Sequence, residues 1–259
     1  MIHGHWLKAY GIDGVYTKEA VKPEDLETFL RSLEANGYAG CNVTVPHKET
    51  AFRLADVRHA SAIAVGAANT LWHDQGKLVA ANTDTYGYMT YLDLRYPNWP
   101  DGNSAVSVLG AGGAARAIIF GFLKAGASEV RIFNRSAARA YELQRLFGPR
   151  VKVFDWEERS TGSRDSRVVV NTTTLGMKGI GDTELDVAQL DPASIVSDIV
   201  YVPLETPLLA RARERGLRTL DGLGMLLHQA VPGFEVWFGV TPAVTSELYD
   251  LMVREIEGR

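Results

Sequence analysis

The chain has 259 residues, of which 46% are hydrophobic and 22% charged, and its formal net charge is −4. These values are typical of a globular protein with one large domain or two modest ones, and the acidic balance disfavours nucleic acid or an anionic membrane as a partner. The single cysteine, Cys41, excludes an intrachain disulfide and fits a reducing cytoplasm. We find no signal-peptide pattern, no apolar run approaching the roughly 18–20 residues of a membrane span, and only scattered histidines, so no metal site is predicted.

Residues 1–103 alternate between strand-like and helix-like patterns. We expect a helix over 22–38, because Pro23 and acidic residues open it and Gly37 lies near its end. The other elements predicted here are strands at 15–21 and 40–46, a helix at 48–55, a hairpin that pairs 62–72 with 76–84, and a helix at 85–96. The stretch 97–103 is rich in Pro, Gly and Asn and predicts a connector.

Residues 104–221 repeat a different pattern, in which short apolar strands alternate with helices. The strands are predicted at 104–110, 129–136, 167–173 and 193–201, and the helices at 113–127, 137–148 and 207–216. This alternation predicts βαβ units, and the almost continuous apolar character of the strands indicates a parallel sheet that is covered on both faces. The remaining residues, 222–239 and 242–258, are predicted to be helical.

The segment VLGAGGAARA (108–117) is a variant of the fingerprint that binds dinucleotides. It places Gly110, Ala111, Gly112, Gly113 and Ala114 between a predicted strand and a predicted helix. In that context the first glycine permits a tight turn, the second lets the backbone approach a pyrophosphate, and the helix N-terminus offers free N–H groups. The alternative is a tight turn with no ligand.

The end of the second strand in this region bears on the choice of cofactor. NAD-preferring sites usually carry an acidic residue there, which binds the ribose 2′-hydroxyl. This chain has Asn134, Arg135 and Ser136 instead, with Arg139 one helical turn later. Two guanidinium groups and a hydroxyl suit a 2′-phosphate, so we predict NADP rather than NAD.

Polar residues also follow the predicted strands of the first third of the chain. They occur in NVTVPHK (42–48), GAANT (66–70) and ANTD (81–84). A lysine beside a carboxylate can transfer a proton, because the pair fixes the geometry and tunes the pKa. Lys48 and Asp84 are the candidates for such a pair.

These motifs together resemble the shikimate dehydrogenase family. The matching stretches, which occur in the family's order across nearly the whole chain, are NVTVPHK, GAANT, NTD, LGAGGAARA, FNRS, VNTTTLGM, DIVY and DGLGMLLHQA. The resemblance implies a cytoplasmic enzyme of aromatic amino-acid (chorismate) biosynthesis that interconverts shikimate and 3-dehydroshikimate with NADP(H). It also implies two α/β lobes with a cleft between them, one of them a Rossmann-like NADP-binding domain. We expect no metal, nucleic acid or membrane partner, and either a monomer or a homodimer.

The same resemblance implies roles for individual residues. Lys48 matches the family's catalytic lysine and Asp84 its aspartate partner. The residues that match substrate-binding positions are Thr44, Asn69, Tyr201 and Gln229. The residues that match cofactor-binding positions are Gly110, Ala111, Gly112, Gly113, Ala114, Asn134, Arg135, Ser136, Arg139, Gly222 and Met225.

The chain departs from the family at its start. The family normally begins with a further strand and a Ser-x-Ser motif that binds the substrate carboxylate, whereas this chain starts at Met1, in or just before the following helix. Either the recorded start is too late, or the chain is a short form with a damaged substrate site. We expect the chain to bind NADP and to bind shikimate poorly.

We predict a substrate-binding domain of residues 1–83 and 222–259 and an NADP-binding domain of 84–221, in which 84–103 is a connecting helix and hinge. Two alternatives remain open from the sequence. One is a quinate/shikimate dehydrogenase, and the other is a non-catalytic NADP-binding protein.

Overall fold

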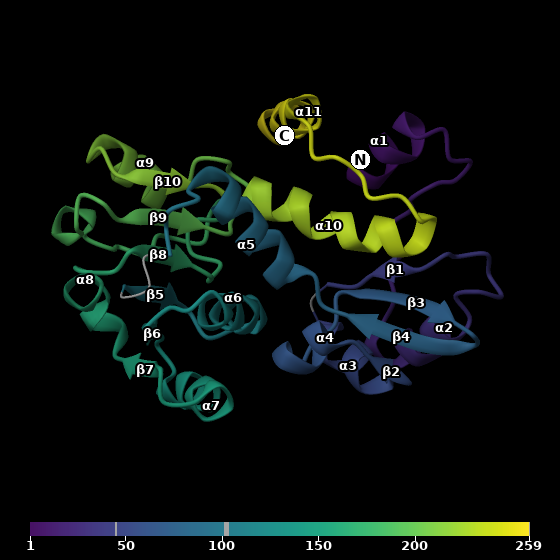
Figure 1. The fold of residues 1–259 in the computed structure, drawn as a ribbon, viewed down its shortest axis with the longest axis horizontal. Helices are drawn as coiled ribbons and strands as arrows, with labels where there is room; N and C mark the ends of the chain where they lie inside the picture. Colours follow the sequence, from purple (N-terminus) through teal and green to yellow (C-terminus); the bar gives the residue numbers. More distant parts are fainter. Residues whose placement is uncertain (45, 101–103, 259) are drawn as a thin grey trace. The chain divides into compact units, whose positions relative to one another are not determined.

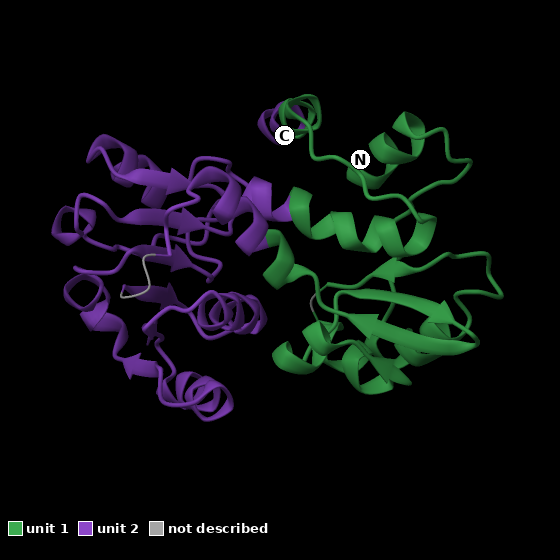
Figure 2. Ribbon diagram, in the orientation of Figure 1, with its two compact units in different colours: residues 1–87, 227–252 green, residues 88–226, 253–259 purple. Residues whose placement is uncertain are grey.

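The computed structural model describes residues 1–44, 46–100 and 104–258 (Figure 1). They form two compact units, coloured separately in Figure 2. Unit 1 comprises residues 1–87 and 227–252, and unit 2 comprises residues 88–226 and 253–259. Three helices contribute residues to both units: α5 (Asp84–Arg95), α10 (Gly222–Phe238) and α11 (Ser246–Glu257). The division into functional domains at 84 and 222 stays a prediction.

Unit 1 contains a mixed four-stranded sheet with the strand order β1-β3-β4-β2. Its strands are β1 (Cys41–Asn42), β2 (Val57–Arg58), β3 (Thr70–Asp74) and β4 (Lys77–Ala81). The pairs β1–β3 and β3–β4 are antiparallel, and β2–β4 is parallel. The β3–β4 hairpin confirms the predicted pairing, and its turn residues Gln75 and Gly76 both have positive φ, as the tightest hairpin turns require.

The helices of unit 1 bury small and aliphatic side chains against this sheet. Besides parts of the shared helices they are α1 (Ile2–Ala9), the 3₁₀ turn η1 (Pro23–Asp25), α2 (Leu26–Arg31), α3 (Lys48–Leu54) and α4 (Ala60–Val65). Leu30 of α2, Ala51 of α3 and Ala62 of α4 belong to one core with Leu71 and Leu78 of the sheet. This core fixes the start of α3, where Lys48 lies.

Unit 2 contains a six-stranded parallel sheet, which confirms the predicted βαβ organisation. Its strands are β5 (Ala105–Leu109), β6 (Glu129–Phe133), β7 (Val151–Phe154), β8 (Val168–Asn171), β9 (Ile195–Asp198) and β10 (Arg218–Leu220). Their order is β10-β9-β8-β5-β6-β7, and every pair is parallel. This is the doubly wound order of dinucleotide-binding domains, and the strand order reverses between β5 and β8.

Apolar residues of the strands in unit 2 cover both faces of the sheet. On β8, Val168 and Val170 belong to one core, and Val169 belongs to a second. The helices and 3₁₀ turns of this unit, besides the shared helices, are α6 (Gly113–Lys124), α7 (Ala137–Phe147), η2 (Trp156–Glu158), α8 (Arg159–Gly162), η3 (Val187–Gln189) and α9 (Pro207–Glu214). Phe122 of α6 packs in the first core and Leu208 of α9 in the second, so both faces are covered, as the strand composition predicts.

Two of the segments predicted in unit 1 differ in the structure. Residues 15–21 were predicted as a strand but form none, and Val15 is 86% exposed; Thr17, Lys18 and Glu19 leave this segment little apolar surface to bury. The helix predicted over 22–38 ends at Arg31. The Ser32 hydroxyl bonds the Phe29 carbonyl at 3.1 Å, and such side-chain bonds compete with helix propagation.

Other predicted boundaries also shift. Residues 62–65, predicted as strand, end helix α4, which stops at Gly66 with φ +70°. A short apolar run does not distinguish a buried helix from a strand. Strand β1 covers only Cys41–Asn42 of the predicted 40–46, since Pro46 follows and a turn joins His47 N to Thr44 O at 2.8 Å. In unit 2, β7 and β10 were not predicted. No helix within the described residues is both long and apolar enough to span a membrane.

Candidate active site

Three polar segments meet at one edge of the unit 1 sheet. The register places Asn42, at the end of β1, opposite Thr70, at the start of β3, and Thr70 opposite Ala81, at the end of β4. The chain then continues from β4 into α5, whose first residue is Asp84. The segment after β1 leads into α3, whose first residue is Lys48. The antiparallel pairing therefore gathers NVTVPHK, GAANT and ANTD at one place.

Lys48 and Asp84 form an ion pair at this edge. The Nζ atom of Lys48 lies 2.7 Å from Oδ2 of Asp84, and the Nδ2 atom of Asn69 donates to the other oxygen, Oδ1, at 2.9 Å. The Asp84 side chain is 3% exposed and that of Lys48 is 24% exposed. The carboxylate is thus held on both oxygens, while the ammonium group, which has three N–H donors, stays reachable by a ligand.

The orientation of Asn69 is fixed by its neighbours. Its Oδ1 atom accepts from the backbone N–H of Thr83 at 2.9 Å and from the Thr70 hydroxyl at 3.0 Å. Since a backbone N–H can only donate, the oxygen of the Asn69 amide must face Thr83 and the nitrogen must face Asp84. In addition, Asn82 Oδ1 accepts from the Asp84 backbone N–H at 3.0 Å. These bonds preorganise the pair before any ligand arrives.

Asn42 is a member of this network that the sequence reasoning missed. Its Nδ2 atom donates to the Asn69 carbonyl at 3.1 Å and to the Thr70 hydroxyl at 3.2 Å, and its Oδ1 accepts from the Tyr16 hydroxyl at 2.9 Å. Burial raises the pKa of Tyr16 to about 12, so this hydroxyl remains a donor at neutral pH. The signal that could have found Asn42 is its place at the start of NVTVPHK, where a strand ends.

The ring of His3 packs against that of Tyr16. The two rings stack with their centroids 4.3 Å apart, and the His3 ring also lies 5.4 Å from that of Trp237. Burial lowers the pKa of His3 to about 4, so the ring is neutral at neutral pH. Tyr16, whose hydroxyl donates to Asn42, is therefore packed in an aromatic cluster with His3 and Trp237.

Two predicted substrate residues of unit 1 lie apart from the ion pair's hydrogen bonds. Thr44 is exposed after β1, and Gln229 is half-buried on α10. Within the described part of the chain, no hydrogen bond joins either residue to Lys48 or Asp84. Their side chains remain available to a ligand, and their roles stay predictions.

The glycine-rich turn of unit 2 has the geometry of a phosphate-binding turn. Gly110 has φ +109°, and a Cβ atom there would lie 2.8 Å from the Thr172 hydroxyl, so only glycine fits. Helix α6 begins at Gly113, and both Gly112 and Gly113 are exposed with open space beside them. Backbone N–H groups at this helix N-terminus are therefore accessible to an anion.

The predicted 2′-phosphate residues follow the adjacent strand. Asn134 comes directly after β6 and donates from Nδ2 to the carbonyl of Ser136 at 2.8 Å, which shapes the turn into α7. Arg135 and Arg139 are both exposed. No acidic residue stands between Phe133 and the start of α7, so this turn offers positive charge and donors.

The remaining predicted residues, Tyr201 for the substrate and Gly222 and Met225 for the cofactor, lie after β9 and at the start of α10. Tyr201 follows β9 and is 38% exposed. Gly222 begins α10, and a Cβ atom there would lie 2.3 Å from the Ile199 carbonyl, so the helix starts in direct contact with the chain that follows β9. Asp221 accepts from the backbone N–H of Leu223 at 2.9 Å and so caps this helix. Met225 lies one turn further along and is buried.

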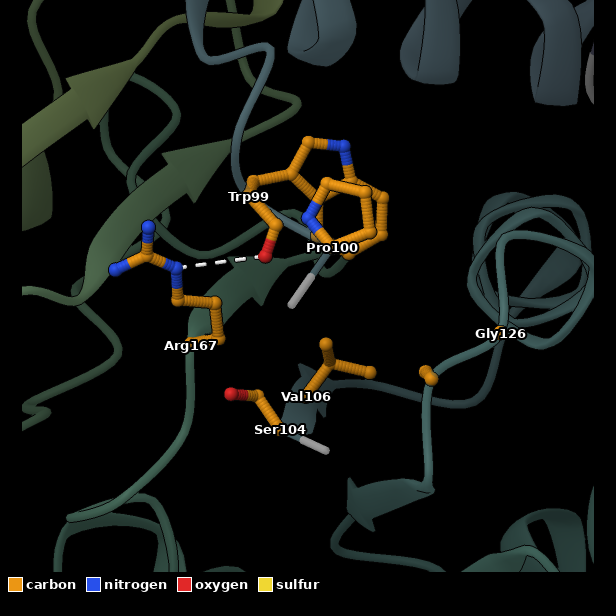
Figure 3. Close-up of a pocket in the computed structure, with 7 residues that line it drawn as sticks. Trp99, Pro100, Ser104, Val106, Gly126 and Arg167 are labelled. Atoms are coloured by element: carbon orange, nitrogen blue, oxygen red, sulfur yellow. Dashed lines mark hydrogen bonds between the residues drawn. The ribbon is translucent and has the colours of Figure 1, made fainter. Parts of the chain in front are cut away.

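A pocket at the opposite end of the unit 2 sheet is not part of this arrangement. Figure 3 shows it lined by Trp99, Ser104, Gly126 and Arg167, with Nε of Arg167 bonded to the Trp99 carbonyl at 3.4 Å. Ser104 and Arg167 directly precede β5 and β8, so the pocket lies at the amino ends of these strands. Doubly wound sheets bind ligands at the carboxyl ends.

Comparison with known proteins identifies the family. A shikimate dehydrogenase (NADP(+)) from Azorhizobium caulinodans is 49% identical over 259 residues, which is 100% of this chain and 92% of the relative. The chain belongs to the shikimate dehydrogenase family. The family's substrate-binding-domain model, "Shikimate dehydrogenase substrate binding domain", matches residues 1–71, and its "Shikimate 5'-dehydrogenase C-terminal domain" model matches 222–245. Residues 105–173 match the model "NADP oxidoreductase coenzyme F420-dependent".

Solved structures of two similar dehydrogenases share this fold. The shikimate 5-dehydrogenase from Thermus thermophilus, in complex with NADP(H) and shikimate, is 30% identical with a TM-score of 0.85, covering 98% of this chain and 93% of that one. A quinate dehydrogenase from Corynebacterium glutamicum, in complex with NAD, is 30% identical with a TM-score of 0.87, covering 99% of this chain and 92% of that one. The predicted two-domain α/β fold is thereby confirmed.

Proposed function

We propose that this chain is an NADP-dependent oxidoreductase that interconverts shikimate and 3-dehydroshikimate in cytoplasmic aromatic amino-acid biosynthesis. The observation that carries the chemistry is the Lys48–Asp84 ion pair, held on its inner side by Asn69 and open on the lysine side. The 49% identity to a shikimate dehydrogenase (NADP(+)) over the whole chain supports the choice of substrate and cofactor.

The pair acts in proton transfer. In the oxidative direction, Lys48 acts as the neutral amine, after releasing one proton to solvent, and its nitrogen takes the proton of the substrate hydroxyl as the hydride leaves the same carbon. In the reductive direction, the pair returns a proton to the carbonyl oxygen. Asp84 keeps Lys48 in place, since its carboxylate is immobilised by Asn69 and by the N-terminus of α5. Bound NADP supplies the hydride acceptor, and NADPH the donor.

The residues of unit 2 fit NADP. The N-terminus of α6, at Gly112 and Gly113, offers backbone donors to the pyrophosphate, and Ala111 and Ala114 flank it. Arg135 and Arg139, with Asn134 and Ser136, would hold the 2′-phosphate, because the turn has no acid that would repel it. We propose that Gly222 and Met225 bracket the nicotinamide, which the tight start of α10 supports.

The substrate is held by polar groups from both ends of the chain. We propose that Thr44, Asn69, Tyr201 and Gln229 contact its hydroxyl and carboxylate groups. Asn69 has one further N–H beyond the bond to Asp84, and Thr44 and Tyr201 are exposed. Asn42, held by Tyr16, joins this set on the evidence of its contacts with Asn69.

A matrix of two substrates and two cofactors tests the proposed function. Initial rates with shikimate or quinate, each with NADP or NAD, should be highest for shikimate with NADP. A quinate dehydrogenase would prefer quinate, and a non-catalytic NADP-binding protein would bind NADP in calorimetry without turnover with either substrate. Size-exclusion chromatography with light scattering tests the expectation of a monomer or a homodimer.

A further inference from the structure

A buried carboxylate ends strand β9 in unit 2 and belongs to none of the roles above. Asp198 is 0% exposed, and burial raises its pKa to about 6. Its Oδ1 atom accepts from Asn171 Nδ2 at 2.9 Å and from the Val200 backbone N–H at 3.0 Å, and its Oδ2 accepts from the Thr206 hydroxyl at 2.8 Å. Only hydrogen-bond donors surround the carboxylate in these contacts, so the network needs an acceptor at this position.

On one side, Asp198 fixes the turn that follows β8. The Asn171 side chain, at the end of β8, also donates to the Leu175 carbonyl at 2.8 Å and accepts from the Thr173 backbone N–H at 3.0 Å. It therefore closes the turn of residues 172–175, and Asp198 holds it in that orientation. The same turn lies against Gly110, since a Cβ atom there would lie 2.9 Å from Cγ2 of Thr173.

On the other side, Asp198 fixes the chain that follows β9. Its bond to the Val200 N–H sets the peptide units of Ile199 and Val200, whose carbonyl oxygens lie 2.3 and 2.7 Å from where a Cβ atom of Gly222 would be. Tyr201 is the next residue. The Asp198 carboxylate thus orders the turn after β8 and the segment that carries Tyr201. That segment also contacts Gly222 at the start of α10.

We propose that Asp198 is a positioning residue for the nicotinamide end of the NADP site. This inference rests on the proposed function, in which Gly222 and Met225 bracket the nicotinamide and Tyr201 contacts the substrate beside it. The adenosine end is assigned to the turns after β5 and β6, and the sheet reverses its order between β5 and β8. A dinucleotide that spans this reversal places its two halves over different strands. The direct contacts of Asp198 are all with residues after β8 and β9, so we expect it to act mainly on the nicotinamide half.

Separate probes for the two halves of the cofactor test this assignment. The first variant is Asp198→Asn in the full chain, which turns an oxygen into an N–H donor among three donors. We expect the Kd for NADP to rise and kcat for shikimate oxidation to fall, each by about 10- to 100-fold, as for one lost charge-assisted bond. The Kd for adenosine 2′,5′-bisphosphate, which carries only the adenosine half, should change by less than about twofold.

Two variants at Thr206 apply the same test with a milder change in the network. Thr206→Val removes the hydroxyl donor, whereas Thr206→Ser retains it and should restore the Kd for NADP. Ser194→Ala is the matched control, because Ser194 directly precedes β9, at the end opposite Asp198, and its buried hydroxyl donates to the Ser166 carbonyl at 2.7 Å. We expect this control to lower the melting temperature without changing the ratio of the two Kd values.

The proposal is overturned if Asp198→Asn and Thr206→Val weaken both probes equally, or if they leave the Kd for NADP unchanged. If Asp198→Asn does not fold, the Kd values of Thr206→Val and Thr206→Ser for the two probes decide the question in the same way. The binding comparison does not depend on turnover. A wild-type chain that binds both probes but does not oxidise shikimate would refute the proposed function, while the ratio of the two Kd values would still decide the role of Asp198.

Discussion

Replacing Lys48 with methionine removes the charge of the ion pair and keeps most of the side chain's length. The carboxylate of Asp84, 3% exposed, would keep its bond from Asn69 but lose the ammonium 2.7 Å from Oδ2. Removing one partner of a fully buried pair costs about 3–5 kcal/mol. Because Lys48 is 24% exposed, water can reach the vacated side, and we expect the smaller loss of about 2–3 kcal/mol in the free energy of unfolding.

The effect on catalysis should be larger than the effect on stability. Loss of a group that transfers a proton lowers kcat by about 10²- to 10⁴-fold. The Kd for NADP should stay unchanged, since neither Lys48 nor its hydrogen-bond partner Asp84 is among the residues that we propose to bind the cofactor. The double variant Lys48→Met/Asp84→Asn leaves no carboxylate unpaired. Its loss of unfolding free energy should therefore be about 1–3 kcal/mol smaller than the sum of the losses in the two single variants.

The assays are urea unfolding and steady-state oxidation of shikimate at saturating NADP. Lys77→Met is the matched control, because Lys77 is an exposed lysine of the same unit, at the start of β4. In kcat, the single and double variants at the ion pair should be similarly impaired, as expected for groups that act as one unit. A kcat of Lys48→Met within about threefold of wild type, with the control normal, would refute the assigned role.

Three further predictions concern unit 2. Arg135→Ala should raise the Kd for NADP about 10- to 150-fold more than the Kd for NAD, while Arg145→Ala, near the C-terminus of α7, the helix that follows Arg135, should affect both equally; equal losses in Arg135→Ala would show that it does not contact the 2′-phosphate. Gly110→Ala should lower the free energy of unfolding by about 1–3 kcal/mol more than Gly126→Ala, since both have positive φ but only Gly110 faces a contact at 2.8 Å; similar losses in urea unfolding would contradict the contact argument. Because burial raises the folded-state pKa of Asp198 from 3.8 to about 6, its contribution to stability is fully present below pH 3.8 and is lost as the pH rises through 6; the wild-type free energy of unfolding, measured relative to Asp198→Asn, should therefore fall by about 2 kcal/mol between pH 4 and 7, and a flat difference would contradict it.

The nucleotide-binding half was readable from the sequence because its strands are short apolar runs bounded by glycines and by amphipathic helices. Strand β7 escaped prediction because its alternation in VKVF covers only four residues, and β10 because it has three. Edge strands of this kind are defined by their neighbours, β6 and β9, rather than by their own composition.

The polar site was only partly readable. Strand-end polar residues indicated a Lys48–Asp84 pair, whereas Asn69 was predicted only from the family resemblance; the antiparallel register brings all three to one edge. The contribution of Asn42 depends on its bond to Tyr16, which is 26 residues away and lies in a segment wrongly predicted as a strand. The buried network around Asp198 joins three separate turns. Such tertiary contacts leave no local pattern in the sequence.

The most direct test of the central claim follows the hydride itself. Shikimate that carries deuterium on the carbon to be oxidised is incubated with NADP and the chain, and the reduced cofactor is analysed by mass spectrometry. Our account predicts that the deuterium appears in NADPH, at a rate that falls by about 10²-fold or more in Lys48→Met. Unlabelled NADPH, or labelling that Lys48→Met leaves unchanged, would contradict it.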